Sequence, residues 1–316
     1  MRPQEQERRT PELWVHTANF LPWTTVVSNE TLVKWTESTG ADKMEWIAAG
    51  KGPVGPAYDV LVKPVAALQK IFGERLGGGH VIFNPYATVW SMLGRRPDPL
   101  RPKRPIALYN MLLASKDISE AAIHKLNEVN KGNFPVVVYP PFKGRNIFGQ
   151  YENMRYQTHP AVFNDNRDAG KITQAVKNGD YSGVCVDLYH FQEATDKNVR
   201  PFGVIEDELK RTLETFREEG VLKEIHVQPG RREGLDKRIG SDNDLRAMLK
   251  GSYRNSRLGR LLTFLVRDLG FMGPYTLEID PRSLAKIYGK GVYYPPSLGG
   301  SMFEAQRTAV DYVRRA

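Results

Sequence analysis

The sequence predicts an α/β protein folded as a closed (β/α)8 barrel, a TIM barrel, because short apolar runs alternate with helical patterns along the chain. Eight strand-like runs are found, and several are continuous stretches of Val, Ile and Phe, as expected of strands buried on both faces. In the second half the runs recur about every 40–50 residues, the length of a strand, a helix and two loops. Eight strands in one chain of 316 residues favour a closed barrel over an open sheet.

The expected strands span, in chain order, residues 13–18, 43–47, 79–84, 134–139, 155–163, 183–188, 223–228 and 275–280. The expected helices span residues 30–37, 57–73, 119–129, 168–177, 204–219, 242–268 and 301–315. Asn29 is the expected cap of the first helix, and Gly220 is the expected stop of the fifth. Gly251 and Gly259 are expected to interrupt the helix over 242–268.

Two stretches in the first half predict irregular crossovers. Residues 85–117 are long and proline-rich and are expected to contain an extra short helix. Residues 140–154 carry little helical pattern, so one crossover helix is expected to be missing there or replaced by a loop. We expect one domain over residues 1–316, with a flexible segment at 1–11 and a C-terminal helical extension at 289–316.

The composition is that of a globular protein, with 41% hydrophobic and 26% charged residues. Cys185 is the single cysteine, which excludes an intrachain disulfide and fits a reducing compartment. The N-terminus is polar, and no apolar run reaches the roughly 18 residues needed to span a bilayer. We therefore expect a cytoplasmic protein without membrane contact.

A net charge of +9 and a pI near 9.4 suit an anionic partner, although a solvated basic surface would give the same values. On a continuous helix Arg246, Lys250, Arg254 and Arg257 would share one face and could follow a phosphate backbone. Nucleic acid is therefore an open but less favoured partner, and a small anionic or sugar-like substrate is preferred. No P-loop and no Gly-x-Gly-x-x-Gly motif is present, so no nucleotide cofactor is expected. The sequence leaves a homo-oligomer open.

Three apolar runs in the second half end in residues that can bind a metal. Gly183-Val-Cys-Val-Asp187 continues to His190, a second run contains His226, and a third runs through Glu278. In a closed parallel barrel the C-terminal ends of the strands meet at one mouth, so these side chains are expected to meet in space. Carboxylates and imidazole together suit a divalent metal such as Mn, Mg, Co or Zn.

These motifs resemble the xylose isomerase-like TIM barrels, a superfamily of sugar isomerases, sugar epimerases and endonuclease IV. Val184-Cys-Val-Asp187-Leu-Tyr-His190 is similar to the strand-six Asp-x-x-His motif of that superfamily. Ile225-His226-Val and Thr276-Leu-Glu278-Ile are similar to its strand-seven histidine and strand-eight glutamate, and Asp42-Lys-Met-Glu45-Trp to its early Gly-Phe-Asp-x-Val-Glu strand. The pattern covers about two-thirds of the chain.

The resemblance implies that Asp187, His226 and Glu278 bind a divalent metal, and that Glu278 also transfers protons with His190 as an orienting residue. In the isomerases and epimerases two glutamates move a proton on the substrate carbon, while the metal polarises the adjacent carbonyl. Substrate contacts are expected from Arg231, His159, His16 and His80.

One departure from the family concerns the fifth strand, where members with an intact site carry a further glutamate. The run expected here, 155–163, has no glutamate at its tip, so Gln157 or His159 would have to substitute. A two-base reaction then loses one base.

The sequence therefore favours a metal-assisted sugar or sugar-phosphate isomerase or epimerase, and two alternatives stay open. The strand-tip residues could make structural hydrogen bonds in a catalytically degenerate barrel that acts as a binding or interaction protein. An endonuclease IV-like phosphodiesterase is less favoured, because after the seventh strand Asp236 is present but Arg238 replaces the expected histidine.

Overall fold

Eight parallel strands close into a barrel in which each strand pairs with its neighbours in chain order and β8 pairs with β1. The computed structural model describes residues 10–20, 28–49, 70–82, 136–138, 149–152, 166–179, 181–188, 202–229, 242–250, 256–279 and 301–316. The strands are β1 Leu13–His16, β2 Lys43–Ala49, β3 Leu76–Ile82, β4 Val136–Val138, β5 Gly149–Glu152, β6 Gly183–Asp187, β7 Leu222–Val227 and β8 Tyr275–Leu277. The (β/α)8 barrel predicted from the sequence is confirmed.

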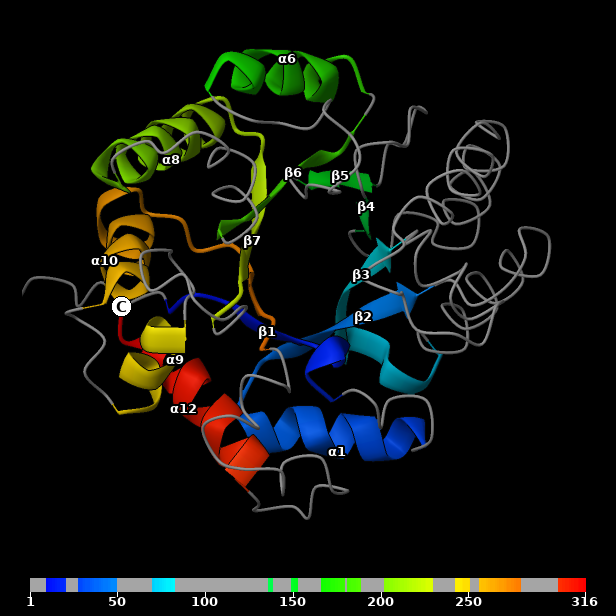
Figure 1. The fold of residues 1–316 in the computed structure, drawn as a ribbon. Helices are drawn as coiled ribbons and strands as arrows, with labels where there is room; N and C mark the ends of the chain where they lie inside the picture. The colour runs from blue at the N-terminus through cyan, green and yellow to red at the C-terminus, as the bar shows by residue number, and fades with distance from the viewer. Residues whose placement is uncertain are drawn as a thin grey trace, which may run out of the picture.

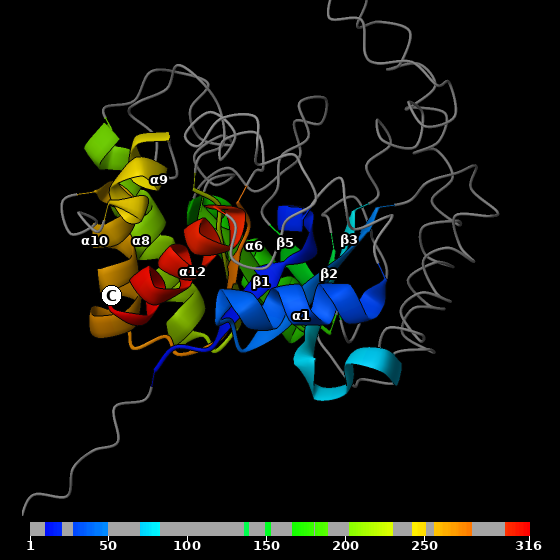
Figure 2. The same cartoon turned by 90° about the horizontal axis from the view of Figure 1, so that it is seen from below.

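The described helices are α1 Asn29–Thr39, α6 Asn166–Lys177, α8 Phe202–Glu218, α9 Asp242–Leu249, α10 Arg257–Thr263 and α12 Ser301–Arg314. They follow one another around the outside of the barrel from α6 through α8, α10, α9 and α12 to α1 (Figure 1). Shorter turns are η1 Thr17–Phe20, η3 Gly73–Arg75 and the π-helical turn η6 Phe264–Asp268, which follows α10 directly. From below, α12 and α1 lie side by side across one flank of the barrel (Figure 2). No helix in these parts of the chain is long and apolar enough to cross a membrane.

The first helix shows how local sequence sets an element. Ser28 is extended and its hydroxyl accepts a hydrogen bond from the backbone N–H of Thr31, so Ser28 caps α1 instead of the predicted Asn29. Gly40 ends the helix at φ +76°, a left-handed conformation that glycine adopts without strain. Leu32 and Trp35 lie on its buried face. Gly220 at φ +70° ends α8 in the same way, as predicted.

The apolar core lies between the barrel and the helices. On β6, Val184 and Val186 join a buried cluster that includes Leu213 of α8 and Phe303 of α12. Strand side chains alternate between two faces, so the residues between these valines face the barrel interior. Burial of this apolar layer fixes the register of each strand and with it the set of residues that point inward.

The strand-five prediction was wrong. The place between β4 and β6 is taken by Gly149–Glu152, which pairs with both neighbours, whereas residues 153–165 lie outside the described part of the chain. We predicted a strand at 155–163 because that run contains apolar residues. Gly-Gln-Tyr-Glu is short and mostly polar, and it lies in the stretch where we expected no regular element.

The predicted long helix over 242–268 is also divided differently. Gly259 lies inside α10 and does not interrupt it. Ser256 is extended and caps α10 through a hydrogen bond from the backbone N–H of Gly259, so the continuous helix needed to align Arg246 with Arg257 is contradicted. The helix predicted at 119–129, most of that at 57–73, and Gly251 lie outside the described residues.

Candidate active site

Strand β7 places three polar side chains in one line along the inside of the barrel. Glu224, His226 and Gln228 alternate with the apolar Ile225 and Val227, and all five are buried. Because strand side chains alternate, the three polar residues share one face. Burying such groups is costly unless they are paired, so this line of polar residues in the barrel interior is a candidate site.

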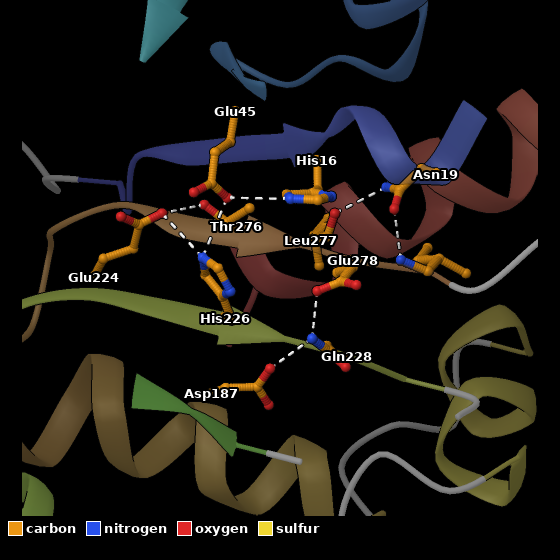
Figure 3. A network of polar contacts seen from close by, with 11 residues as sticks. His16, Asn19, Glu45, Asp187, Glu224, His226, Gln228, Thr276, Leu277 and Glu278 are labelled. Atoms are coloured by element: carbon orange, nitrogen blue, oxygen red, sulfur yellow. Dashed lines mark hydrogen bonds and ion pairs between the residues drawn. The ribbon is translucent and has the colours of Figure 1, made fainter. Parts of the chain in front are cut away.

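At the C-terminal end of this line, Gln228 joins two carboxylates (Figure 3). Its side-chain nitrogen donates to Asp187, 2.5 Å from Oδ2, and also to the carboxylate of Glu278. Asp187 ends β6 and Glu278 follows β8, the two strands that flank β7. Asp187 is fully buried, whereas Glu278 is partly exposed.

Asp187, His226 and Glu278 come together as the sequence predicts. One ligand atom from each lies within 4.8 Å of the other two. Ligands bound about 2.0–2.2 Å from one ion lie at most about twice that distance apart, so the arrangement is close to what one ion requires. Two carboxylates and an imidazole fit Mg, Mn, Co or Zn by their chemistry. That they bind a metal stays a prediction.

A second set of buried side chains lies on the other side of His226, away from Asp187 and Gln228 (Figure 3). Nε2 of His226 lies 3.2 Å from Oε2 of Glu45 and 3.4 Å from Oε1 of Glu224. The hydroxyl of Thr276 donates to the same Glu224 oxygen at 2.6 Å. Nε2 of His16 is 4.0 Å from Oε2 of Glu45, and the two imidazole rings lie edge to face with centroids 6.2 Å apart. Cys185 also comes within 4.8 Å of the Glu224 and His226 ligand atoms.

Asn19 fixes the backbone on both sides of Glu278. Its side-chain nitrogen donates to the carbonyl of Leu277 at 2.8 Å, and its oxygen accepts from the backbone N–H of Ile279 at 2.7 Å. Asn19 lies in the η1 turn directly after β1 and is fully buried. The turn after β1 therefore sets the position of the residue after β8.

Strand β5 ends in a glutamate, contrary to the expectation that this strand has none. Glu152 is the last residue of β5 and pairs with Cys185, which stands two positions before Asp187 on β6. The register thus places a glutamate on the strand adjacent to the Asp187 strand, at the height of the interior cluster. Gln157 and His159 lie outside the described residues, and their proposed roles stay predictions.

The remaining predicted residues are placed only in part. His190, Arg231 and His159 lie outside the described residues, and their proposed roles stay predictions. His80 pairs with Ile47 and Val137 in the backbone of β3. His16 is fully buried beside Glu45 and His226, and its proposed contact with substrate stays a prediction.

Sequence reasoning assigned no role to Gln228, Glu224, Glu45 or Asn19. For the β7 residues the signal was present as polar residues at every second position within an apolar run. For Glu45, only the family motif marked the position. Asn19 carried no sequence signal, because its partners are 258 and 260 positions away.

No protein-family model matches the chain, and no curated protein matches it. Among solved structures, D-allulose 3-epimerase from Methylomonas sp. in complex with D-allulose aligns at 14% identity over 97% of both chains, with a TM-score of 0.45. A 3-keto-D-glucoside 4-epimerase from E. coli aligns at 15% identity over 97% of this chain and 100% of that one, also with a TM-score of 0.45. An L-ribulose 3-epimerase aligns at 11% identity over 95% and 92%, with a TM-score of 0.43.

The chain is similar to these sugar epimerases along nearly its whole length. At such identities and TM-scores the likeness assigns no activity and no residue role to this chain. The functional proposal therefore rests on the buried polar residues in the barrel interior of this chain.

Proposed function

We propose that the chain is an isomerase or epimerase that acts on a sugar or sugar phosphate and moves a proton on a carbon next to a carbonyl group. The observation that carries the proposal is the meeting of Asp187, His226 and Glu278 at the C-terminal ends of three adjacent strands. In parallel barrels this end of the sheet is where substrates react.

Asp187, His226 and Glu278 would hold the divalent metal. A metal there supplies positive charge beside the oxygen that becomes negative when the neighbouring carbon loses its proton. Glu278 is the partly exposed member of the three, so its carboxylate is the best placed to reach a substrate and to take up and return the proton. Glu152, at the end of the adjacent β5 strand, is the second proton carrier that a two-base exchange requires.

The substrate class follows from charge. The net charge of +9 favours an anionic sugar derivative, and Arg231 and Arg232 follow the β7 tip in sequence, where a guanidinium can bind a phosphate through two parallel hydrogen bonds. Sugar phosphates are therefore the first substrates to test, with free ketoses second.

Gln228 supports one competing function. An amide nitrogen that donates to both Asp187 and Glu278 does what a bound cation would do, namely reduce the repulsion between two carboxylates. A barrel in which this amide replaces the metal permanently would bind a sugar-like ligand without catalysis. This candidate requires that no divalent metal displaces the amide.

Solvent exchange tests the proposal directly. The protein is loaded with Mn²⁺ or Mg²⁺ and incubated in D₂O with phosphorylated and free ketoses, and deuterium at the carbon next to the carbonyl is followed by NMR. We expect incorporation with the wild type and a loss of about 10²–10⁴-fold in Glu278→Gln. Asp187→Asn should lose metal binding together with exchange.

The control is Glu304→Gln, the same change at an exposed position of α12. It should exchange at the wild-type rate. Metal-loaded, folded protein that exchanges no proton on any ketose would contradict the proposal. Absence of metal binding together with sugar binding would instead establish the non-catalytic barrel.

A further inference from the structure

The imidazole of His226 stands between two groups of carboxylates. On its inner side, Nε2 lies 3.2 Å from Glu45 and 3.4 Å from Glu224. Nδ1 lies on the side of Asp187 and Gln228 (Figure 3). Glu45, Glu224 and Asp187 are fully buried, so the contacts of Glu45 and Glu224 with Nε2 lie where water does not weaken them.

The two inner carboxylates are themselves fixed in place. Glu45 comes from β2, three strands away from β7 around the ring, and reaches His226 through the barrel interior. Glu224 stands two residues before His226 on the same strand, and the hydroxyl of Thr276 on β8 donates to it. Neither carboxylate is among the residues expected to bind the metal. Their common neighbour is one nitrogen of one predicted ligand.

This arrangement selects one form of the imidazole. A carboxylate only accepts hydrogen bonds, so the hydrogen of a neutral imidazole is favoured on the nitrogen that lies nearer the two carboxylates. The lone pair of neutral His226 is then on Nδ1, on the side of Asp187 and Glu278. A carboxylate on the far nitrogen of a metal-binding histidine fixes ring orientation and tautomer and makes the imidazole a stronger ligand.

We propose that Glu45 and Glu224 are positioning residues for the metal centre: they hold His226 with its hydrogen on Nε2 and its Nδ1 lone pair directed at the ion. This inference rests on the proposed function, because it assumes that Asp187, His226 and Glu278 bind a metal. It extends the site inward to two carboxylates that touch neither metal nor substrate.

The test measures metal affinity and ligand geometry together. Co²⁺ is titrated into wild type, Glu45→Gln and Glu224→Gln, with affinity from competition against a chromophoric chelator and geometry from the visible absorption of bound cobalt. Glutamine keeps the shape and an accepting oxygen but loses the charge. We expect about 10-fold weaker binding for each glutamine variant and about 100-fold for Glu224→Leu, the range seen when such outer partners are removed. The cobalt bands should shift even at saturation.

A purely structural role would not produce this pattern. Thermal unfolding in excess EDTA reports the fold without metal, so it separates a loss of stability from a loss of metal affinity. Glu304→Gln, at an exposed position of α12, should match the wild type in metal affinity, cobalt spectrum and stability.

Three outcomes separate the hypotheses. Equal affinity and identical cobalt spectra in wild type and both glutamine variants would overturn the inference and leave the proposed function intact. Absence of cobalt binding by the wild type would remove the proposed function itself, and the inference with it. Binding of two cobalt ions by the wild type and one by Glu224→Gln would overturn the positioning role, because Cys185, Glu224 and His226 would then form a metal site of their own.

Discussion

Gln228 donates its side-chain amide to Asp187, with 2.5 Å between Nε2 and Oδ2, and the same nitrogen donates to the carboxylate of Glu278. The two acceptors belong to the strands on either side of β7. A neutral amide thus joins two carboxylates that would repel each other without a cation, and it competes with any ion for both.

Gln228→Ala is expected to tighten metal binding and to weaken the metal-free fold. If the competing hydrogen bonds are worth about 1.4 kcal/mol, the affinity rises about tenfold. Without metal the variant loses hydrogen bonds to charged groups, about 1.5–3 kcal/mol of unfolding free energy. Calorimetric Mn²⁺ titration and urea unfolding with EDTA measure the two effects.

The matched control is Gln174→Ala, where an exposed glutamine of α6 donates to Asn178. It should change neither quantity. If Gln228→Ala instead weakens metal binding, then Gln228 acts as a ligand through its amide oxygen, and the competition argument is wrong.

Asn19 is expected to matter for both stability and activity because it holds the backbone on either side of Glu278. Asn19→Ala leaves a buried carbonyl and a buried N–H without their partner, which costs about 2–4 kcal/mol. A misplaced Glu278 should also lower exchange by about 10²-fold. Urea unfolding and the D₂O assay measure the two losses.

Asn19→Asp separates the two hydrogen bonds. It keeps the acceptor for the N–H of Ile279 and loses the donor to Leu277, so an intermediate stability is expected. Asn178→Ala, at an exposed position, should stay within about 0.5 kcal/mol of the wild type. Wild-type stability and activity in Asn19→Ala would show that the two hydrogen bonds of Asn19 are not needed to position Glu278.

The strands richest in Val and Ile could be predicted from the sequence. That their C-terminal ends lie together at one end of the barrel could also be predicted. Asp187, His226 and Glu278 are distant in sequence, yet parallel strands in a closed barrel must end at one mouth, which is why their proximity could be predicted. Gln228 could not be placed, because its role depends on the distances between three strands. The alternation along β7 was visible, but only closure of the barrel decides which face becomes the interior.

Strand β5 shows a different limit. Its four residues carry one aromatic side chain and no aliphatic one, so apolar pattern favoured the neighbouring run. Which short segment becomes a strand in a barrel depends on pairing with the two neighbouring strands. The sequence of the segment itself carries no information about that pairing. The error left Glu152 out of the sequence prediction.

Glu152→Gln tests the corrected strand. If Glu152 is the second proton carrier, the change should lower deuterium exchange by about 10²–10⁴-fold with the fold intact. The reason is its register position on β5, paired with Cys185 and adjacent to the Asp187 strand. Circular dichroism checks the fold. Unchanged exchange would confine proton transfer to Glu278 and make the reaction a one-base process.

The last prediction concerns how the stability of the protein depends on pH through Tyr275 of β8, the strand that Glu278 follows. Burial raises the pKa of Tyr275 well above its usual value, and its hydroxyl donates to the carbonyl of Phe271 at 2.8 Å. A raised pKa in the folded state means that this contribution is fully present below the unfolded value of about 10 and is lost as pH rises beyond it. Tyr275→Phe should therefore be about 1 kcal/mol less stable at pH 7.5 and should lose less stability than the wild type between pH 9 and 11. Urea unfolding at several pH values measures both slopes, and parallel slopes would show that Tyr275 does not govern the alkaline limit.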